Sequence, residues 1–416
     1  MIGTAADKPA ETASGRPLRV VLVDAWCMVP YYERYLYQAL ERRGIGVELA
    51  TTDYSLNPGY FRQNGVPYRA PMLNVASRIP LIAARHRRWV KAIEYGMNLL
   101  GLTGRFLASK PDVVHIQWLP MLQTSGIEIE FLKLWKRRGI PLVYTVHNVL
   151  PHDTKDRHRR QYAKVYSMAD ALICHTHESR NQLMEEFGIS ASRLWHIPHG
   201  PLFHDLPRPS KTDARAQLGF KRDEFVVLWQ GVVAPYKGLD LLLSAWKAVV
   251  QACPQARLVI AGTGKDAFLA DIRRQVLDLA LESSVKLDLR YIAVEELPAY
   301  FQAADTLALP YLAVTTSGAL MTALTYGKPI VASDLPAFRE NVTHEKSALL
   351  FPPGDANALA AALVRLVGDA SLRNRLGAGA EQLQIQTMWD RIAATTEDCY
   401  RSLCPHRAAV TVAVPE

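Results

Sequence analysis

The sequence has few cysteines and lacks the features of an integral membrane protein. Five scattered cysteines among 416 residues form neither a disulfide framework nor the close pairs of a zinc site, so we expect reduced thiols. No uncharged apolar run reaches the roughly 18 residues that a membrane-spanning helix needs. Residues 1–17 lack the apolar core of a secretory signal and read as a mobile leader. These absences predict a cytoplasmic protein that is soluble or peripheral to a membrane.

Positive charge is concentrated in the first half of the chain. The net charge is +8, and residues 1–200 hold 26 Lys and Arg against 17 Asp and Glu, whereas residues 201–416 hold 22 against 23. Such an asymmetry predicts an anionic partner for the first half, which is a phosphorylated ligand, a nucleic acid or an acidic membrane surface.

Short β-branched runs alternate with longer helix-period segments along the whole chain, which predicts an α/β fold with parallel sheets. The alternation pauses at residues 206–221, a polar segment with two prolines that we interpret as a linker. Two similar halves, 18–205 and 222–388, predict two Rossmann-like domains that face a cleft, with ligands at the carboxyl ends of the strands. The predicted strands are 18–24, 47–51, 112–118, 141–147, 171–175, 225–229, 257–261, 285–289, 306–310 and 330–333.

Two glycine-bearing turns follow predicted strands in the second half. Gln230–Gly238 (QGVVAPYKG) places Lys237 just before a helix, where backbone N–H groups and the helix dipole favour an anion such as a diphosphate. A solvated turn lysine is the alternative. In AGTGK, Gly262 and Gly264 either let the backbone approach a ligand closely or form only a tight turn.

A segment rich in hydroxyl groups precedes a later helix. Thr315, Thr316, Ser317 and Gly318 lead into the helix-like residues 319–326. Hydroxyl groups and a glycine at a helix start either cap the helix or hold a phosphate, and the two readings stand about equal here.

Taken together, these segments resemble a known family. QGVVAPYKGLDLLLSAW, RLVIAGTGK and AADTLALPYLAVTTSGALMTALTYGKPIVASD, in this order, resemble the donor-binding domain of GT-B glycosyltransferases, in particular the family 4-like group. In the first half, PDVVHIQW, IPLVYTVHNVLPHD and HIPHG resemble the acceptor domain of bacterial members that build exopolysaccharides. TMWDRIAATTEDCY resembles the final helix that crosses back to the first domain, here 389–404, before a tail at 405–416. The resemblance spans roughly residues 18–403 and implies the GT-B architecture.

The resemblance implies a role for particular residues. The donor-binding set would be Lys237, Gly262, Gly264, Thr316, Ser317 and Gly318. Within it, Lys237 would contact the nucleotide diphosphate, the glycines would form the turn beside the nucleotide, and the helix start would receive the distal phosphate. His147, in TVHN, matches a histidine that projects towards the transferred sugar and is the catalytic candidate. A buried histidine held by the backbone is the alternative, and His152 and Asp24 are reserves for a catalytic base.

The sequence also departs from the family pattern. Retaining members usually carry two glutamates eight residues apart around the helix, and Val314 and Thr322 occupy those positions. Val232 replaces the arginine that commonly accompanies the lysine. The anomeric outcome therefore stays open. These losses also motivate a non-catalytic GT-B-shaped binding subunit as an alternative, with a sugar-nucleotide epimerase as a third reading.

Residues 78–110 carry seven Lys and Arg against the single Glu94, interleaved with large apolar residues. At helical spacing this gives a basic face beside an apolar one, which predicts an interfacial segment on anionic lipid, with Arg85, Arg87 and Arg88 facing the membrane. An ordinary helix with a solvated basic face is the alternative. No recognition motif accompanies the charge, so we expect no nucleic-acid partner.

These observations predict a hexosyltransferase at the inner face of the cell membrane. It would move a hexosyl unit from a nucleoside-diphosphate sugar to a saccharide acceptor, lipid-linked, in surface or exopolysaccharide biosynthesis. Lys237 and the helix start would stabilise the departing diphosphate. The sequence shows no metal cluster, and the resemblance implies that the donor needs no bound metal and that the enzyme needs no cofactor besides its co-substrate.

Overall fold

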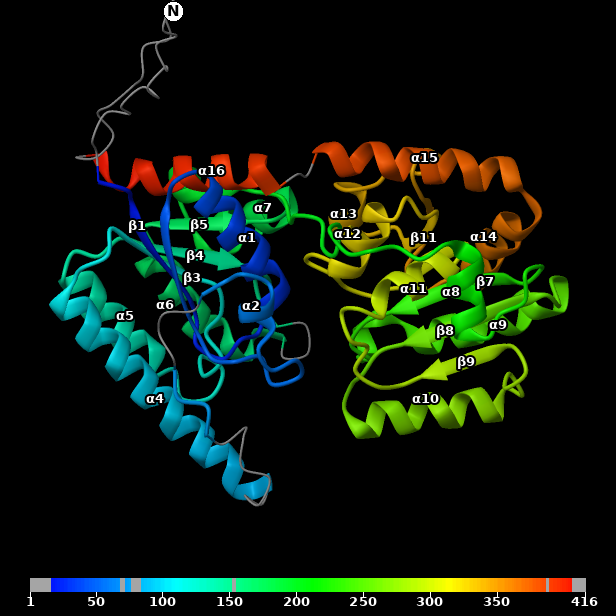
Figure 1. The fold of residues 1–416 in the computed structure, drawn as a ribbon, viewed down its shortest axis with the longest axis horizontal. Helices are drawn as coiled ribbons and strands as arrows, with labels where there is room; N and C mark the ends of the chain where they lie inside the picture. The colour runs from blue at the N-terminus through cyan, green and yellow to red at the C-terminus, as the bar shows by residue number, and fades with distance from the viewer. Residues whose placement is uncertain (1–15, 68–71, 76–83, 152–154, 387–388, 406–416) are drawn as a thin grey trace, which may run out of the picture.

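Two parallel six-stranded sheets form two domains that lie side by side (Figure 1). The computed structural model describes residues 16–67, 72–75, 84–151, 155–386 and 389–405. The strand orders are β2-β1-β3-β4-β5-β6 and β12-β11-β10-β7-β8-β9, with every pairing parallel. The prediction of an α/β fold with two Rossmann-like domains is therefore confirmed.

The first domain holds the strands β1 (Arg19–Asp24), β2 (Gly46–Thr51), β3 (Val113–Ile116), β4 (Leu142–Val146), β5 (Ala171–Cys174) and β6 (Leu194–His196). Its helices are α1 (Pro30–Arg42), α2 (Tyr60–Gln63), α4 (Ala84–Ala108), α5 (Glu128–Arg137), α6 (Arg159–Met168) and α7 (His177–Phe187), with short 3₁₀ turns at Lys155–His158 and Ala191–Arg193. Every residue of β3, β4 and β5 is buried, because helices cover both faces of the sheet.

The second domain holds β7 (Phe225–Gln230), β8 (Ala256–Ala261), β9 (Val285–Asp288), β10 (Thr306–Leu309), β11 (Ile330–Ser333) and β12 (Leu349–Phe351). Its helices are α8 (Lys211–Leu218), α9 (Leu239–Ala252), α10 (Asp266–Asp278), α11 (Leu297–Ala303), α12 (Gly318–Thr325), α13 (Pro336–Arg339), α14 (Ala356–Gly368) and α15 (Ala370–Gln386), and a 3₁₀ turn spans Pro235–Lys237. The sequence analysis missed β6 and β12, which have only three residues each and are too short to show a pattern.

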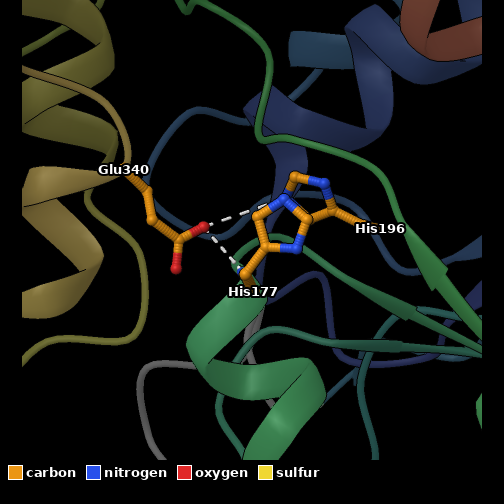
Figure 2. A group of neighbouring side chains, drawn as sticks. All are labelled: His177, His196 and Glu340. Carbon is orange, nitrogen blue, oxygen red and sulfur yellow. Dashed lines mark hydrogen bonds and ion pairs between the residues drawn. The ribbon is translucent and has the colours of Figure 1, made fainter.

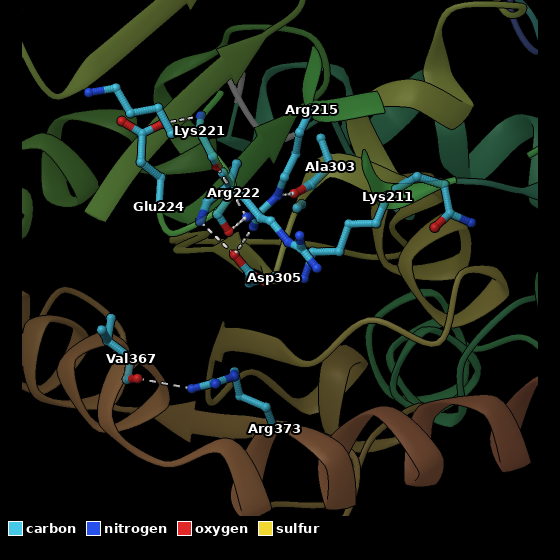
Figure 3. A network of polar contacts seen from close by, with 12 residues as sticks. Lys211, Arg215, Lys221, Arg222, Glu224, Ala303, Asp305, Val367 and Arg373 are labelled. Atoms are coloured by element: carbon cyan, nitrogen blue, oxygen red, sulfur yellow. Dashed lines mark hydrogen bonds and ion pairs between the residues drawn. The ribbon is translucent and has the colours of Figure 1, made fainter. Parts of the chain in front are cut away.

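The segment 206–221, predicted as a linker, contains the helix α8, which packs against α11 of the second domain. Arg215 lies in this helix and is almost fully buried, and its guanidinium bonds to the Asp305 carboxylate at 2.6 Å and to the Ala303 carbonyl at 3.1 Å (Figure 3). Ser210 caps the helix start by accepting a hydrogen bond from the Asp213 N–H. Most of the polar segment therefore belongs to the second domain, and its cap was the signal in the sequence.

Helix α16 (Trp389–Ser402) returns to the first domain and packs along α1, in line with α15 at the same edge of the molecule (Figure 1). Trp389 is buried against Gly200, where an added Cβ would lie 2.3 Å from the indole ring. Its indole N–H donates to the Pro201 carbonyl at 2.7 Å. Among the described helices, none is long and apolar enough to cross a membrane.

Candidate active site

A cleft of about 600 Å³ lies between the two domains. The first domain contributes the residues after β4 and one side of α7, and the second contributes the loops after β10 and β11. Its lining is Val149, Leu150, Pro151, Arg159, Glu178, Ser179, Gln182, Glu186, Leu312, Ala313, Val314, Thr315, Leu335 and Pro336. The lining residues follow the carboxyl ends of β4 and β5 in one sheet and of β10 and β11 in the other, which is where parallel sheets bind their ligands.

Lys237 lies beside the cleft, in the turn before α9. The Tyr236 carbonyl accepts a hydrogen bond from the N–H of Leu312, a cleft residue, at 2.7 Å. The Lys237 ammonium lies 5.4 Å from the ring centre of Tyr311 and 5.9 Å from that of Trp229. Gly231 has φ +145°, a backbone conformation that favours glycine, and an added Cβ there would lie 2.8 Å from the ammonium and displace it.

The charge of Lys237 has no counterion among the described residues. Burial lowers the pKa of its ammonium, and no carboxylate contributes to the shift. Aromatic faces attract a cation by about 0.5–2 kcal/mol, but they do not neutralise its charge. The arrangement therefore leaves a cation available to an anion that enters the cleft.

The glycines of AGTGK meet the turn after β7 and not open space. Gly262 has φ +151°, and an added Cβ there would lie 1.8 Å from the Gly231 carbonyl oxygen. On Gly264 the added Cβ would lie 2.7 Å from the Val233 carbonyl oxygen. Both glycines therefore let the turns after β7 and β8 pack backbone to backbone, which fixes the position of Lys237.

The helix start at α12 is a cap in this structure. The Ser317 hydroxyl accepts a hydrogen bond from the Leu320 N–H at 3.2 Å, and Ser317 is 7% exposed. An added Cβ on Gly318 would lie 3.3 Å from a methyl carbon of Leu202, which belongs to the segment leaving the first domain. Thr315 lines the cleft, and Thr316 follows it. The capping role is thus visible for Ser317, and its phosphate role stays a prediction.

His147 directly follows β4 and is 6% exposed. Its Nε2–H donates to the Gln117 amide oxygen at 3.2 Å, and its ring packs against Tyr32 at 5.3 Å between centres. Burial lowers the pKa of His147 well below its usual value, with further lowering from the neighbouring histidines, so the ring is neutral at pH 7. In the sequence, His147 stands two residues before Val149, where the cleft lining begins.

His147 belongs to a cluster of neutral histidines around Tyr32. The His175 and His199 rings lie 5.4 and 5.1 Å from the Tyr32 ring. His175 Nδ1–H donates to the Ile197 carbonyl at 2.9 Å, and His199 Nδ1–H to the Gly200 carbonyl at 2.7 Å. Burial lowers the pKa of His175 to about 3 and that of His199 to about 4. The sequence analysis quoted HIPHG but did not single out these two residues.

Asp24 and His152 are the reserve candidates for a catalytic base, and of these the structure describes Asp24. Asp24 is fully buried, and burial raises its pKa to about 6, although its carboxylate accepts hydrogen bonds from the Met28 and Val29 N–H groups. His152 lies outside the described residues. Arg85, Arg87 and Arg88 fall in α4, but the description of that helix does not extend to their side chains.

The positions of the missing family residues hold groups that cannot ionise. Val314 lines the cleft, and the buried Thr322 donates from its hydroxyl to the Gly318 carbonyl at 2.7 Å inside α12. Val232 is 57% exposed. Sequence reasoning missed Glu178, a carboxylate in the first turn of α7 at the cleft, whose pKa is raised by burial and by the neighbouring Glu340. In the sequence, Glu178 could have been found from its position just after the predicted strand 171–175, because ligands bind at the carboxyl ends of parallel strands.

Both halves of the chain match glycosyltransferase families. The family described as "Glycosyltransferase Family 4" matches residues 31–200, and "Glycosyl transferases group 1" matches residues 224–369. A D-inositol 3-phosphate glycosyltransferase of Kineococcus radiotolerans is 29% identical over 407 residues, which is 90% of each chain. An uncharacterized glycosyltransferase of Methanocaldococcus jannaschii is 24% identical, over 88% of this chain and 92% of the relative.

Solved structures share the two-domain fold. Anabaena HepE in complex with UDP and glucose has a TM-score of 0.72 at 18% identity, over 92% of this chain and all of that one. A sucrose-phosphate synthase from Thermosynechococcus elongatus has a TM-score of 0.72 at 22% identity, over 94% of this chain and all of that one. The fold is thus that of a GT-B protein. With the two family matches, the chain belongs to the GT-B glycosyltransferases of the family 4-like group and is an enzyme that uses a nucleotide sugar.

Proposed function

We propose that this enzyme transfers a hexosyl unit from a nucleoside-diphosphate sugar to a lipid-linked saccharide acceptor, in surface or exopolysaccharide biosynthesis. The observation that carries the donor half is Lys237, a cation with two aromatic rings and no described counterion beside the cleft. A diphosphate would supply the missing charge. As the glycosidic bond to the donor breaks, negative charge grows on the leaving diphosphate, and a fixed ammonium stabilises it in the transition state.

A uridine diphosphate sugar is the donor that we expect. UDP is the nucleotide in the HepE complexes and in a complex of Staphylococcus aureus TarM, both of which share the fold. A thermal-shift screen of the purified protein against UDP, GDP and ADP tests the choice, because a ligand that binds the folded state alone raises its stability with its affinity. A shift with GDP or ADP that exceeds the UDP shift would reassign the base.

His147 is the residue that we propose to act on the sugar from the first domain. Its neutral ring uses Nε2–H on Gln117, so Nδ1 keeps a lone pair that can accept a hydrogen bond from a hydroxyl group. A histidine with a strongly lowered pKa is a weak general base. We therefore propose that His147 orients the transferred sugar, and that in a retaining reaction the leaving phosphate takes the acceptor proton. Product stereochemistry by NMR tests this, since an inverted anomer would require a base in the first domain.

The membrane half of the proposal is supported by an exposed apolar stripe on α4. Trp89, Ile93 and Leu100 are 74%, 63% and 62% exposed, and Met97 is 52% exposed. Residues at these intervals share one face of a helix. Arg85, Arg87 and Arg88 precede the stripe in the same helix. An exposed apolar face beside basic residues suits the boundary of an anionic bilayer.

Vesicle binding tests the membrane proposal. Replacing Arg85, Arg87 and Arg88 with Gln should weaken binding to anionic vesicles by about 1 kcal/mol per charge, with little change on neutral vesicles. The matched control removes the same charge from the second domain, in Lys247, Arg273 and Arg274 to Gln. If the wild type ignores anionic vesicles, or if both triple variants lose binding equally, the acceptor is not presented at a membrane through α4.

A non-catalytic binding subunit or a sugar-nucleotide epimerase is the alternative to transfer. The valine and threonine at the glutamate positions favour that reading. Incubation with a UDP-sugar and an acceptor membrane fraction distinguishes the three activities. Transfer labels the acceptor, epimerisation changes the free nucleotide sugar, and a binding subunit does neither.

A further inference from the structure

Two histidines and a glutamate meet where the two domains touch, at the rim of the cleft (Figure 2). His177 opens α7, His196 ends β6, and Glu340 directly follows α13 of the second domain. The two imidazole rings lie 3.8 Å apart between centres. One potential ligand atom from each of the three residues lies within 4.8 Å of the others.

The carboxylate is held in place by backbone groups of the first domain. Glu340 Oε2 accepts a hydrogen bond from the His177 N–H at 2.6 Å, and Oε1 accepts one from the Glu178 N–H at 2.9 Å. Glu340 therefore caps the start of α7 from the other domain. Each carboxylate oxygen has a further lone pair, so the cap leaves the group able to bind an ion.

The His196 ring has the environment of a metal ligand. It forms a hydrogen bond with the backbone of His175, while its Nε2 faces Glu340 Oε2 across 3.9 Å. That separation is too long for a hydrogen bond. Two ligands on one tetrahedral zinc ion, each bonded at about 2.0–2.1 Å, lie about 3.4 Å apart.

We propose that His177, His196 and Glu340 form a binding site for one divalent transition-metal ion of the zinc type, which joins the two domains. Two imidazole nitrogens and one carboxylate oxygen are a ligand set that suits Zn²⁺, with water in the fourth position. A backbone hydrogen bond to a ligating histidine is the usual support of such a site. His177 and Glu340 are exposed, and His196 partly so, which gives the ion a path from solvent.

The site is separate from the donor chemistry. Neither Lys237 nor His147 is a ligand of the proposed ion. The expectation that the donor binds without a metal concerns the cleft, whereas this site lies at its rim. Because the ligands come from both domains, the ion binds most tightly in this domain arrangement and stabilises it. Three residues of the cleft lining stand close to the ligands in the sequence: Glu178, Leu335 and Pro336. A bound ion would therefore hold this rim of the cleft at a fixed width.

The test uses full-length protein without a histidine tag, stripped of metal by a chelator. Calorimetric titration with Zn²⁺ should give one equivalent per chain, and Co²⁺ should give visible absorption bands of a site with nitrogen ligands. His177→Ala, His196→Ala and Glu340→Gln should each weaken Zn²⁺ binding at least tenfold. His344→Ala is the matched control, because His344 lies 3.8 Å from Glu345 on the second domain and belongs to no group of three ligands among the described residues.

Each variant is first compared with the wild type by circular dichroism and by its melting temperature without metal. The proposal is overturned if the wild type binds no more Zn²⁺ than the His177→Ala, His196→Ala double variant. It is also overturned if a folded Glu340→Gln variant binds like the wild type, because the ion then does not bridge the domains. A loss of binding in His344→Ala equal to that in the histidine variants would likewise reject the site.

Discussion

The two domains meet the cleft with different chemistry. The first domain contributes histidines that burial keeps neutral, with His147, His175 and His199 around Tyr32. The second contributes a lysine without a described counterion and glycine turns that pack backbone to backbone. Within residues 206–386, which the structure describes throughout, the single histidine is His344, with a half-exposed side chain.

The site in the first domain is built mainly by side chains, whereas the site in the second domain is built mainly by the backbone of two turns. The lysine turn and the AGTGK turn are each one short stretch of sequence, and adjacent strands β7 and β8 bring them together. The histidine cluster instead collects side chains from strand ends and loops that are tens of residues apart. We therefore expect the stability of the first domain to depend on pH. We expect the stability of the second domain to depend on substitutions that add a Cβ to its glycine turns.

Acidification should give the largest effect, and it should act on the first domain. Burial lowers the pKa of His175, and of His115 in the strand β3, to about 3 and that of His199 to about 4, against 6.5 in the unfolded chain. The unfolded state therefore binds more protons, so the stability from these neutral rings is full above pH 6.5 and is lost as pH falls towards 3–4. Between pH 7 and 5 each ring should cost about 2 kcal/mol of unfolding free energy.

One buried group opposes this loss. The pKa of Asp24 is raised to about 6, so its contribution to stability grows as pH falls through 6 towards 3.8, and it recovers about 1 kcal/mol at pH 5. Hydrogen exchange at pH 7 and 5 measures the net effect by domain. Amides of β3, β4 and β5 should lose protection before those of β7 and β8. Equal loss in both domains would contradict the comparison.

Gly262→Ala should destabilise the second domain by about 4 kcal/mol or more, because its Cβ would lie 1.8 Å from a backbone oxygen that cannot move aside. Gly219→Ala is the matched control, with φ +76° and no atom within 4 Å of an added Cβ, and it should cost about 1–2 kcal/mol. Urea unfolding of both variants gives the difference. Similar costs would mean that the turns do not depend on close backbone packing.

His147→Ala should lower turnover by about 10²-fold or more while UDP binding stays nearly unchanged, since the residue acts on the sugar from the first domain. His175→Ala removes a neighbouring ring of the same cluster and should lower turnover much less. The kinetic constants and the UDP affinity of both variants are the readouts. Near-normal turnover in His147→Ala would remove this residue from the site.

Lys237→Ala should weaken UDP binding by about 1.5–3 kcal/mol, the usual contribution of a charged hydrogen bond, and leave the fold intact. Lys265→Ala is the control, because this exposed lysine of the AGTGK turn carries the same charge nearby. Isothermal titration with UDP compares the two. Equal affinity in wild type and Lys237→Ala would return Lys237 to a simple turn lysine.

The sequence by itself determined the α/β class, most of the strands and the turns at their ends. Buried parallel strands read as unbroken apolar runs, and a glycine or a lysine beside a strand end is visible without any partner. It also gave His147, which stands directly after the strand PLVYTV. The helix α8 was hidden because its polar, proline-flanked segment resembles a linker, although the Ser210 cap marks its start.

Only the tertiary structure decided which of these residues lack a partner. The Lys237 ammonium lies against the rings of Tyr311 and Trp229 with no described counterion, and the neutral state of His147 follows from its burial against Tyr32 of α1 and the neighbouring histidines. The meeting of His177, His196 and Glu340 depends on contact between the two domains. Distances of this kind arise from strand order and domain docking, so a linear pattern of residue types does not contain them.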